Sequence, residues 1–103
     1  MNPEDSKIIT LARAARARNG SAEGAAVRDE TGRTYSATNV ALSALTLSAV
    51  QVAVATAVSS GARSLEAVAL VSEGDPSPAD EAVAAELGVA KLLVAGPDGA
   101  LRG

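Results

Sequence analysis

The chain has 103 residues, 48% of them hydrophobic, a formal net charge of −3, and neither histidine nor cysteine. A chain of this length can bury enough surface to fold without disulfides or a structural metal, and we expect one domain over residues 1–103. The acidic balance disfavours a general nucleic-acid binder. The missing residue types exclude Ser-His-Asp and Cys-His catalytic centres and any conventional zinc site.

The composition also constrains the core and the cellular setting. Tyr35 is the only aromatic residue, while alanine and valine dominate the apolar positions. Small side chains fill space only where elements approach closely, so we expect close helix-on-sheet packing and burial by self-association. The absence of cysteine agrees with a reducing, cytoplasmic setting. The N-terminus lacks the features of a signal peptide, and no apolar run reaches the roughly 18 residues of a membrane span.

The first element along the chain is predicted to be a helix that begins at Asn2 and Pro3. Asn2 suits the N-cap, Pro3 suits the first helical position, and two acidic residues follow them. Asn19 and Gly20 end the pattern. Three arginines near this end are interpreted as solvated charges that complement the helix dipole: Arg13, Arg16 and Arg18.

Residues 24–28 and 33–37 alternate between apolar and polar side chains, and residues 29–32 join them with Gly32 at the turn. This pattern predicts a β-hairpin, because glycine tolerates the positive φ that such turns require. Tyr35 follows the alternation of the second strand, so we interpret it as a packing residue.

A long helix is predicted to begin at Ser43 or Thr46 and to end at residues 59–61. Its positions from Leu47 to Val58 are apolar on nearly every side. Such a helix is buried, either in the centre of the domain or between subunits.

Residues 65–71 predict a buried strand, and a second helix start follows at Ser77 and Pro78, with Asp80 placed to complete a capping box. That helix should end near Gly88, before a strand over residues 89–95, a turn and a short C-terminal stub. Lys91 is interpreted as a solvated flank of this strand. The order α-β-β-α-β-α-β predicts a three-layer α/β/α fold with a mixed sheet.

Short segments within this order resemble the small, homotetrameric type of cytidine deaminase over roughly residues 4–95. Residues 24–27 resemble its Val-Gly-Ala-Ala strand, and residues 29–32 resemble the hairpin turn after it. Residues 39–40 resemble the start of its Asn-Val-Glu segment. Residues 46–51 and 57–61 resemble the two ends of its Thr-Ile-Cys-Ala-Glu-Arg helix, and residues 77–82 resemble its Ser-Pro-Cys-Gly-Ala-Cys helix start. The resemblance implies the α/β/α cytidine deaminase-like fold.

The resemblance also implies where a zinc site would lie, and this chain departs from it at every ligand. Zinc deaminases hold the metal with one His or Cys and two Cys, and a nearby Glu transfers protons. The matching positions are Ser48, Ala79 and Ala82 for the ligands and Val50 for the Glu. One hydroxyl and two methyl groups cannot hold zinc, and valine cannot shuttle protons. We therefore expect these positions to be packed with apolar side chains.

These departures predict a catalytically inactive cytidine deaminase-like protein without a cofactor, which acts as a homo-oligomeric or interaction subunit. The family implies a tetramer, and a dimer is the other form considered. We expect no nucleic-acid or membrane partner. One alternative is a nucleoside- or nucleotide-binding module without catalysis. A second alternative is an active deaminase with a rebuilt site.

Four polar residues are candidates for a ligand site, and each has a structural interpretation beside the functional one. Asn39 could bind a sugar, but it also suits the end of a strand and a turn. Ser48 could face a ligand, but an N-cap role is favoured. Asp80 and Glu81 could be catalytic acids, yet acids are expected in the first turn of any helix.

Overall fold

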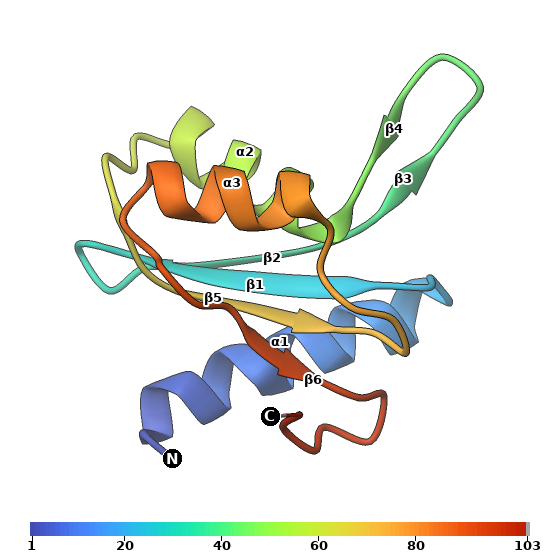
Figure 1. Cartoon of the computed structure of the whole chain (residues 1–103), viewed down its shortest axis with the longest axis horizontal. Coiled ribbons are helices and arrows are strands. Elements are labelled where there is room, and N and C mark those ends of the chain that lie inside the picture. The colour runs from blue at the N-terminus through green and yellow to red at the C-terminus, as the bar shows by residue number, and fades with distance from the viewer. Residues whose placement is uncertain (103) are drawn as a thin grey trace.

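A computed structural model describes residues 1–102 and confirms the three-layer α/β/α fold with a mixed sheet (Figure 1). Helix α1 (Pro3–Asn19) covers one face of the sheet, and helices α2 (Ala49–Ser59) and α3 (Pro78–Glu86) cover the other. No helix within residues 1–102 is both long and apolar enough to cross a membrane.

The main sheet has the strand order β2-β1-β5-β6. Strands β1 (Gly24–Asp29) and β2 (Thr34–Thr38) form the expected hairpin, and β5 (Leu65–Val71) pairs antiparallel with β1. The short strand β6 (Leu93–Ala95) lies parallel to β5. The two central strands, β1 and β5, are covered on both faces, so all but one of their residues are buried.

Two predicted boundaries were wrong, and the first concerns the long helix. Residues that were assigned to its start instead form a small hairpin of β3 (Val40–Ala41) and β4 (Thr46–Leu47), which projects from the body (Figure 1). Helix α2 begins only at Ala49, after the N-cap Ser48. The pairing of β4 with β3 holds this segment extended, so the helix cannot start earlier.

The second wrong boundary is the last strand, which was predicted over residues 89–95 but covers only Leu93–Ala95. After α3, Gly88 adopts a positive φ of 98°, and the Val89 N–H donates to the Ala84 carbonyl. This closure of the helix end uses the residues that precede the strand. Near the C-terminus, Leu101 forms an isolated bridge with Ala95.

Two apolar clusters lie on opposite faces of the sheet, and the α1 cluster confirms the expected close approach of helix and sheet. Gly24 of β1 lies directly under α1, where a Cβ atom would be 2.1 Å from the Ala12 carbonyl oxygen. Buried residues on the α1 face include Ile8, Ile9, Ala12, Ala26 and Val71. Buried residues on the other face include Val27, Val50, Ala53, Val68 and Leu70.

The outward side of α2 is not covered by its own chain. Residues Val50, Ala53 and Ala57 are fully buried against the sheet, whereas Ala55 is exposed and Val58 is 46% exposed. Burial in the centre of the domain is therefore wrong for this side of the helix, because the sheet and α3 together cover only part of its surface. Burial between subunits, the other predicted form, stays a prediction.

Candidate functional site

The N-terminal ends of α2 and α3 meet on the same face of the sheet, at the position where the sequence resemblance implies a metal site. Ser48 is the N-cap of α2, and Asp80 is the third residue of α3. The Ser48 Oγ hydroxyl donates a hydrogen bond to Asp80 Oδ1 at 2.5 Å. The two helix starts are thus joined by a hydroxyl and a carboxylate from residues that lie 32 positions apart in the sequence.

Asp80 is the polar centre of this junction and is only 1% exposed. Its Oδ2 atom accepts the Ser77 N–H at 3.2 Å, and its own N–H donates to Ser77 Oγ at 3.1 Å. These two bonds are the predicted capping box of α3. The additional bond to Ser48 satisfies the other carboxylate oxygen, as a buried charged group requires.

The N-terminus of α2 is likewise occupied by side chains of its own chain. Ser48 Oγ accepts the Gln51 N–H at 3.1 Å, and Gln51 Oε1 accepts the Ser48 N–H at 2.9 Å. Glu23, just before β1, accepts the Ala49 N–H at 3.1 Å through Oε1. The predicted capping role of Ser48 is confirmed, and the positive end of α2 already faces a carboxylate.

The four positions that correspond to the zinc and proton-transfer residues have different environments. Val50 is fully buried in the core. Ser48 is half-buried, whereas Ala79 and Ala82 are exposed. The expectation of an apolar filling therefore holds at Val50 and is wrong at the two alanines, because Asp80 rather than Ala79 or Ala82 turns inward from the first turn of α3.

The donor set at this junction does not fit zinc. Zinc in proteins takes four ligands from thiolates, imidazoles and carboxylates. The junction supplies the Asp80 carboxylate and the neutral Ser48 hydroxyl, while the Glu23 carboxylate at the start of α2 accepts the Ala49 N–H. No group of three or more acidic, histidine or cysteine side chains within residues 1–102 is arranged to hold a metal ion.

Asn39 lies near the junction, and its side chain supports the backbone. Its Oδ1 atom accepts the Glu23 N–H at 3.0 Å, and Glu23 in turn caps α2 through Ala49. This contact supports the interpretation that Asn39 shapes the backbone at the end of a strand. Glu23 was missed by the sequence analysis, because nothing local to residues 21–24 indicates that its carboxylate reaches a helix 26 residues later.

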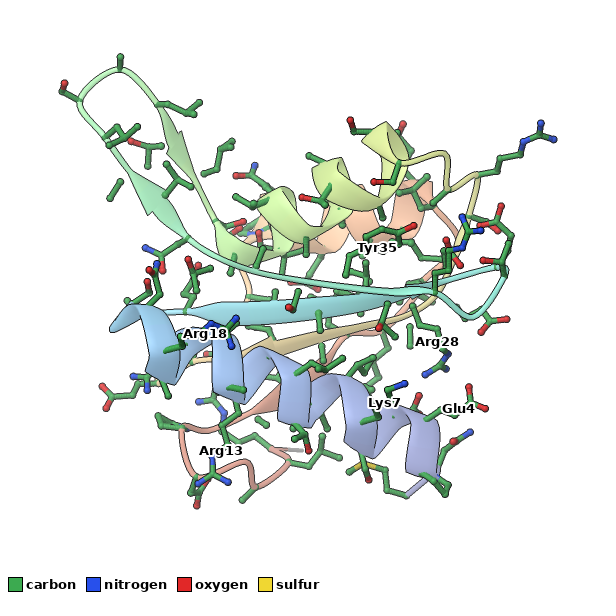
Figure 2. All side chains as sticks on the ribbon, turned by 180° about the vertical axis from the view of Figure 1, so that it is seen from behind. Glu4, Lys7, Arg13, Arg18, Arg28 and Tyr35 are labelled. Atoms are coloured by element: carbon green, nitrogen blue, oxygen red, sulfur yellow. The ribbon has the colours of Figure 1, made fainter. Side chains whose placement is uncertain are left out.

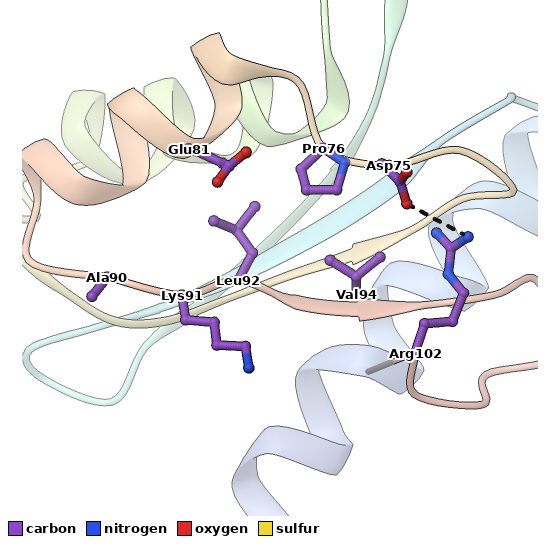
Figure 3. A pocket seen from close by; sticks show the side chains of 8 residues that line it. All are labelled: Asp75, Pro76, Glu81, Ala90, Lys91, Leu92, Val94 and Arg102. Carbon is purple, nitrogen blue, oxygen red and sulfur yellow. Dashed lines mark ion pairs between the residues drawn. The ribbon is translucent and has the colours of Figure 1, made fainter.

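A pocket of about 300 Å³ lies beside α3 and β6, away from these four positions (Figure 3). Asp75 and Arg102 form an ion pair across one end at 4.0 Å. Lys91, the predicted solvated flank, is exposed and also lines it. The full lining is Asp75, Pro76, Glu81, Ala90, Lys91, Leu92, Val94 and Arg102. Of the candidate ligand residues, only Glu81 reaches it.

A second charged cluster lies on the opposite face, between α1 and the sheet. Arg28 is 8% exposed and donates to Glu66 Oε1 at 3.0 Å and to Asp5 Oδ1 at 3.1 Å, with Glu4 beside it at 3.6 Å (Figure 2). Burial alone would lower the pKa of Arg28, but the hydrogen bonds to Glu66 and Asp5 and the charges of Asp5 and Glu4 raise it. The cluster joins α1 to β1 and β5, which is a structural role.

Tyr35 packs beneath α2 against the apolar cluster, as predicted (Figure 2). Its hydroxyl donates to Asp29 Oδ2 at 3.4 Å. Asp29 Oδ1 also accepts the Thr31 N–H, the Thr31 hydroxyl at 2.7 Å and the Arg33 N–H. The Thr31 hydroxyl is the main cause that lowers the pKa of Asp29, and the backbone donors and Tyr35 lower it further, against the opposing effect of burial.

Comparisons with known proteins identify the family to which this chain belongs. A sequence profile of the cytidine deaminase-like family matches residues 1–99. The chain belongs to the cytidine deaminase-like family. No curated protein matches the sequence.

Solved cytidine deaminases share this architecture. The enzyme from Burkholderia pseudomallei is 27% identical with a TM-score of 0.80, over 99% of this chain and 91% of that chain. The enzyme from Mycobacterium tuberculosis is 28% identical with a TM-score of 0.72, over 93% of this chain and 86% of that chain. The enzyme from Mycobacterium leprae, 23% identical with a TM-score of 0.71 over 93% of this chain and 89% of that chain, shares the fold.

Proposed function

We propose that this chain is a catalytically inactive member of the cytidine deaminase-like family that acts as a homo-oligomeric subunit. The observation that carries the proposal is the junction between the two helix starts. Where the family resemblance implies metal ligands, this chain has Ser48, Ala79 and Ala82, and the Ser48 hydroxyl is bonded to Asp80. The buried Val50 leaves no carboxylate to transfer protons at that position.

The alternative of a nucleoside- or nucleotide-binding module depends on Asn39 and on the two helix N-termini. Asn39 Oδ1 is bonded to the Glu23 amide, and both helix N-termini are capped by side chains of the chain itself. A phosphate at α2 would also face the Glu23 carboxylate, which it would have to displace. These contacts favour the inactive subunit over the binding module.

The homo-oligomer is supported by apolar side chains that this chain leaves uncovered. A groove of about 320 Å³ between α2 and α3 is lined by Gln51, Val54, Ala55, Val58, Val83, Glu86 and Leu87. Ala55 and Val58 are exposed in the single chain. The β3–β4 hairpin exposes Leu42 by 62% and Leu45 by 48%. Exposed apolar groups of this kind are typical of interfaces between subunits.

Two measurements test the proposal. Elemental analysis of the purified protein should find no stoichiometric zinc, and incubation with cytidine should release no ammonia; bound zinc together with ammonia release would overturn the inactive assignment. Light scattering at micromolar concentration should give a dimer or a tetramer, and a monomer would overturn the oligomer.

A matched pair of variants locates the interface. Val58→Glu places a charge on the exposed side of α2 and should shift the mass toward the monomer, because a buried unpaired carboxylate is strongly unfavourable. Ser59→Glu adds the same charge one residue later, at an exposed position of the same helix, and should leave the mass unchanged. Equal masses for both variants and the wild type would remove α2 from the interface.

A further inference from the structure

The strongest unassigned feature is the buried carboxylate of Asp80 between two helix starts. Among the fully buried large side chains it is the only acidic one in residues 1–102. Its bonds to Ser77 complete the capping of α3, whereas its bond to Ser48 reaches a different helix and has no role in capping.

The directions of the bonds at Ser48 are determined by the groups around it. Ser48 Oγ accepts the Gln51 N–H, so its own hydrogen is free to point to Asp80 Oδ1. Asp80 accepts at both carboxylate oxygens, from Ser48 and from the Ser77 N–H. Each carboxylate oxygen therefore meets one donor, and the side chain lies at the N-terminal ends of two helices, where acidic residues are favoured.

We infer that Asp80 holds the N-termini of α2 and α3 together, in the structural role that a metal ion would have at this position in a zinc-bound member of the family. The inference rests on the proposed inactive function, because it applies only where the ligand positions hold Ser48, Ala79 and Ala82. We call the Ser77, Asp80 and Ser48 network the carboxylate clasp. Its consequence is that this fold needs no metal for stability.

The decisive experiment is thermal unfolding of the full chain with a matched acid substitution. Asp80→Ala should lower the Tm by roughly 10 °C, because it leaves the Ser48 hydroxyl and the Ser77 amide without their acceptor. Glu81→Ala removes the neighbouring acid, which is exposed in the same helical turn, and should lower the Tm by less than about 2 °C. Equal effects of the two substitutions would overturn the clasp.

A double-mutant cycle separates the clasp from capping alone. Ser48→Ala should lower the Tm by several degrees, and adding it to Asp80→Ala should lower the Tm further by much less, because the partner is already lost. If the two effects simply add, Asp80 acts only within α3 and the inference is wrong. Where Asp80→Ala fails to fold, Asp80→Leu replaces it in the same cycle, since leucine keeps a similar side-chain volume and removes both acceptor oxygens.

Metal dependence gives an independent readout. The wild-type Tm should be the same within error in excess chelator and in added zinc, because binding to the native state alone would raise it. A Tm that falls with chelator would overturn the clasp. The two failures remain distinguishable: additive substitutions in a zinc-free, inactive protein would overturn the clasp and leave the inactive assignment, whereas ammonia release from cytidine would overturn the inactive assignment itself.

Discussion

Two buried aspartates in this protein have similar exposure but bonds of very different reach. Asp29 is 2% exposed and Asp80 is 1% exposed. Asp29 accepts hydrogen bonds only from residues two to six positions later, all within its own hairpin. Asp80 accepts one bond from its own helix and one from Ser48, 32 residues away. A buried carboxylate can thus organise a turn or join two helices, depending on what the fold places beside it.

The hairpin turn over residues 29–32 was predicted from its glycine and its place between two alternating segments. The role of Asp29 in it is local, because its partners follow it directly, which is the usual behaviour of aspartate in turns. The capping role of Asp80 could be predicted for the same reason. Its bond to Ser48 depends on how the sheet places α2 beside α3, and no spacing in the sequence reports that distance.

The largest expected effect on stability comes from Gly24, where the close approach of α1 in the folded chain leaves no room for a side chain. Gly24→Ala should lower the stability by about 3 kcal/mol, because the new Cβ atom would overlap the Ala12 carbonyl and force α1 away from the sheet. Gly74→Ala is the control, since its Cβ would meet only Ser72 Oγ at 3.8 Å. Denaturant unfolding of both variants measures the difference, and similar midpoints would show that α1 moves freely.

An effect of intermediate size is expected in the pH dependence of stability, which depends on the turn that Asp29 organises. The folded pKa of Asp29 lies below its ordinary value of 3.8, so its contribution to stability is present above that value and is lost as the pH falls through the folded pKa. Asp29→Asn should therefore lower the Tm near neutral pH and reduce the loss of Tm between about pH 5 and pH 3.

The control for this pH experiment is Asp75→Asn, at a side chain that is 92% exposed. Its Tm should follow the wild-type pH dependence. If the Tm of Asp29→Asn depends on pH as the wild-type Tm does, the hydrogen bonds of Asp29 within its turn do not stabilise the protein. Asp29 would then not organise the turn.

The smallest expected effect tests which donors matter around Asp29. Tyr35→Phe removes a long hydrogen bond of 3.4 Å but keeps the ring in the core, so the Tm should fall by only a few degrees. Thr31→Val removes the 2.7 Å bond and should have the larger effect, because that bond is the main cause of the lowered pKa of Asp29. A reversed order in thermal unfolding would contradict this ranking.

The fold was predictable where local chemistry and periodicity agree. The hairpin of β1 and β2, the capped start of α3 and the buried β5 all lie where their patterns placed them. The start of α2 was not predictable, because residues 43–48 are apolar enough for a helix, and the pairing of β3 with β4 excludes one. The last strand begins later than predicted for a similar reason, since the Gly88 and Val89 amides close the end of α3.

The candidate site was predictable in its chemistry but not in its geometry. The sequence alone determined that no thiolate or imidazole is present, because side-chain identity decides which ligands exist. Its resemblance to the cytidine deaminases implied that the site positions are Ser48, Val50, Ala79 and Ala82. Only the tertiary structure decided that Asp80 points inward to Ser48 while Ala79 and Ala82 face solvent. Caps and turns act within a few residues, whereas the meeting of two helix starts depends on the packing of both against one sheet.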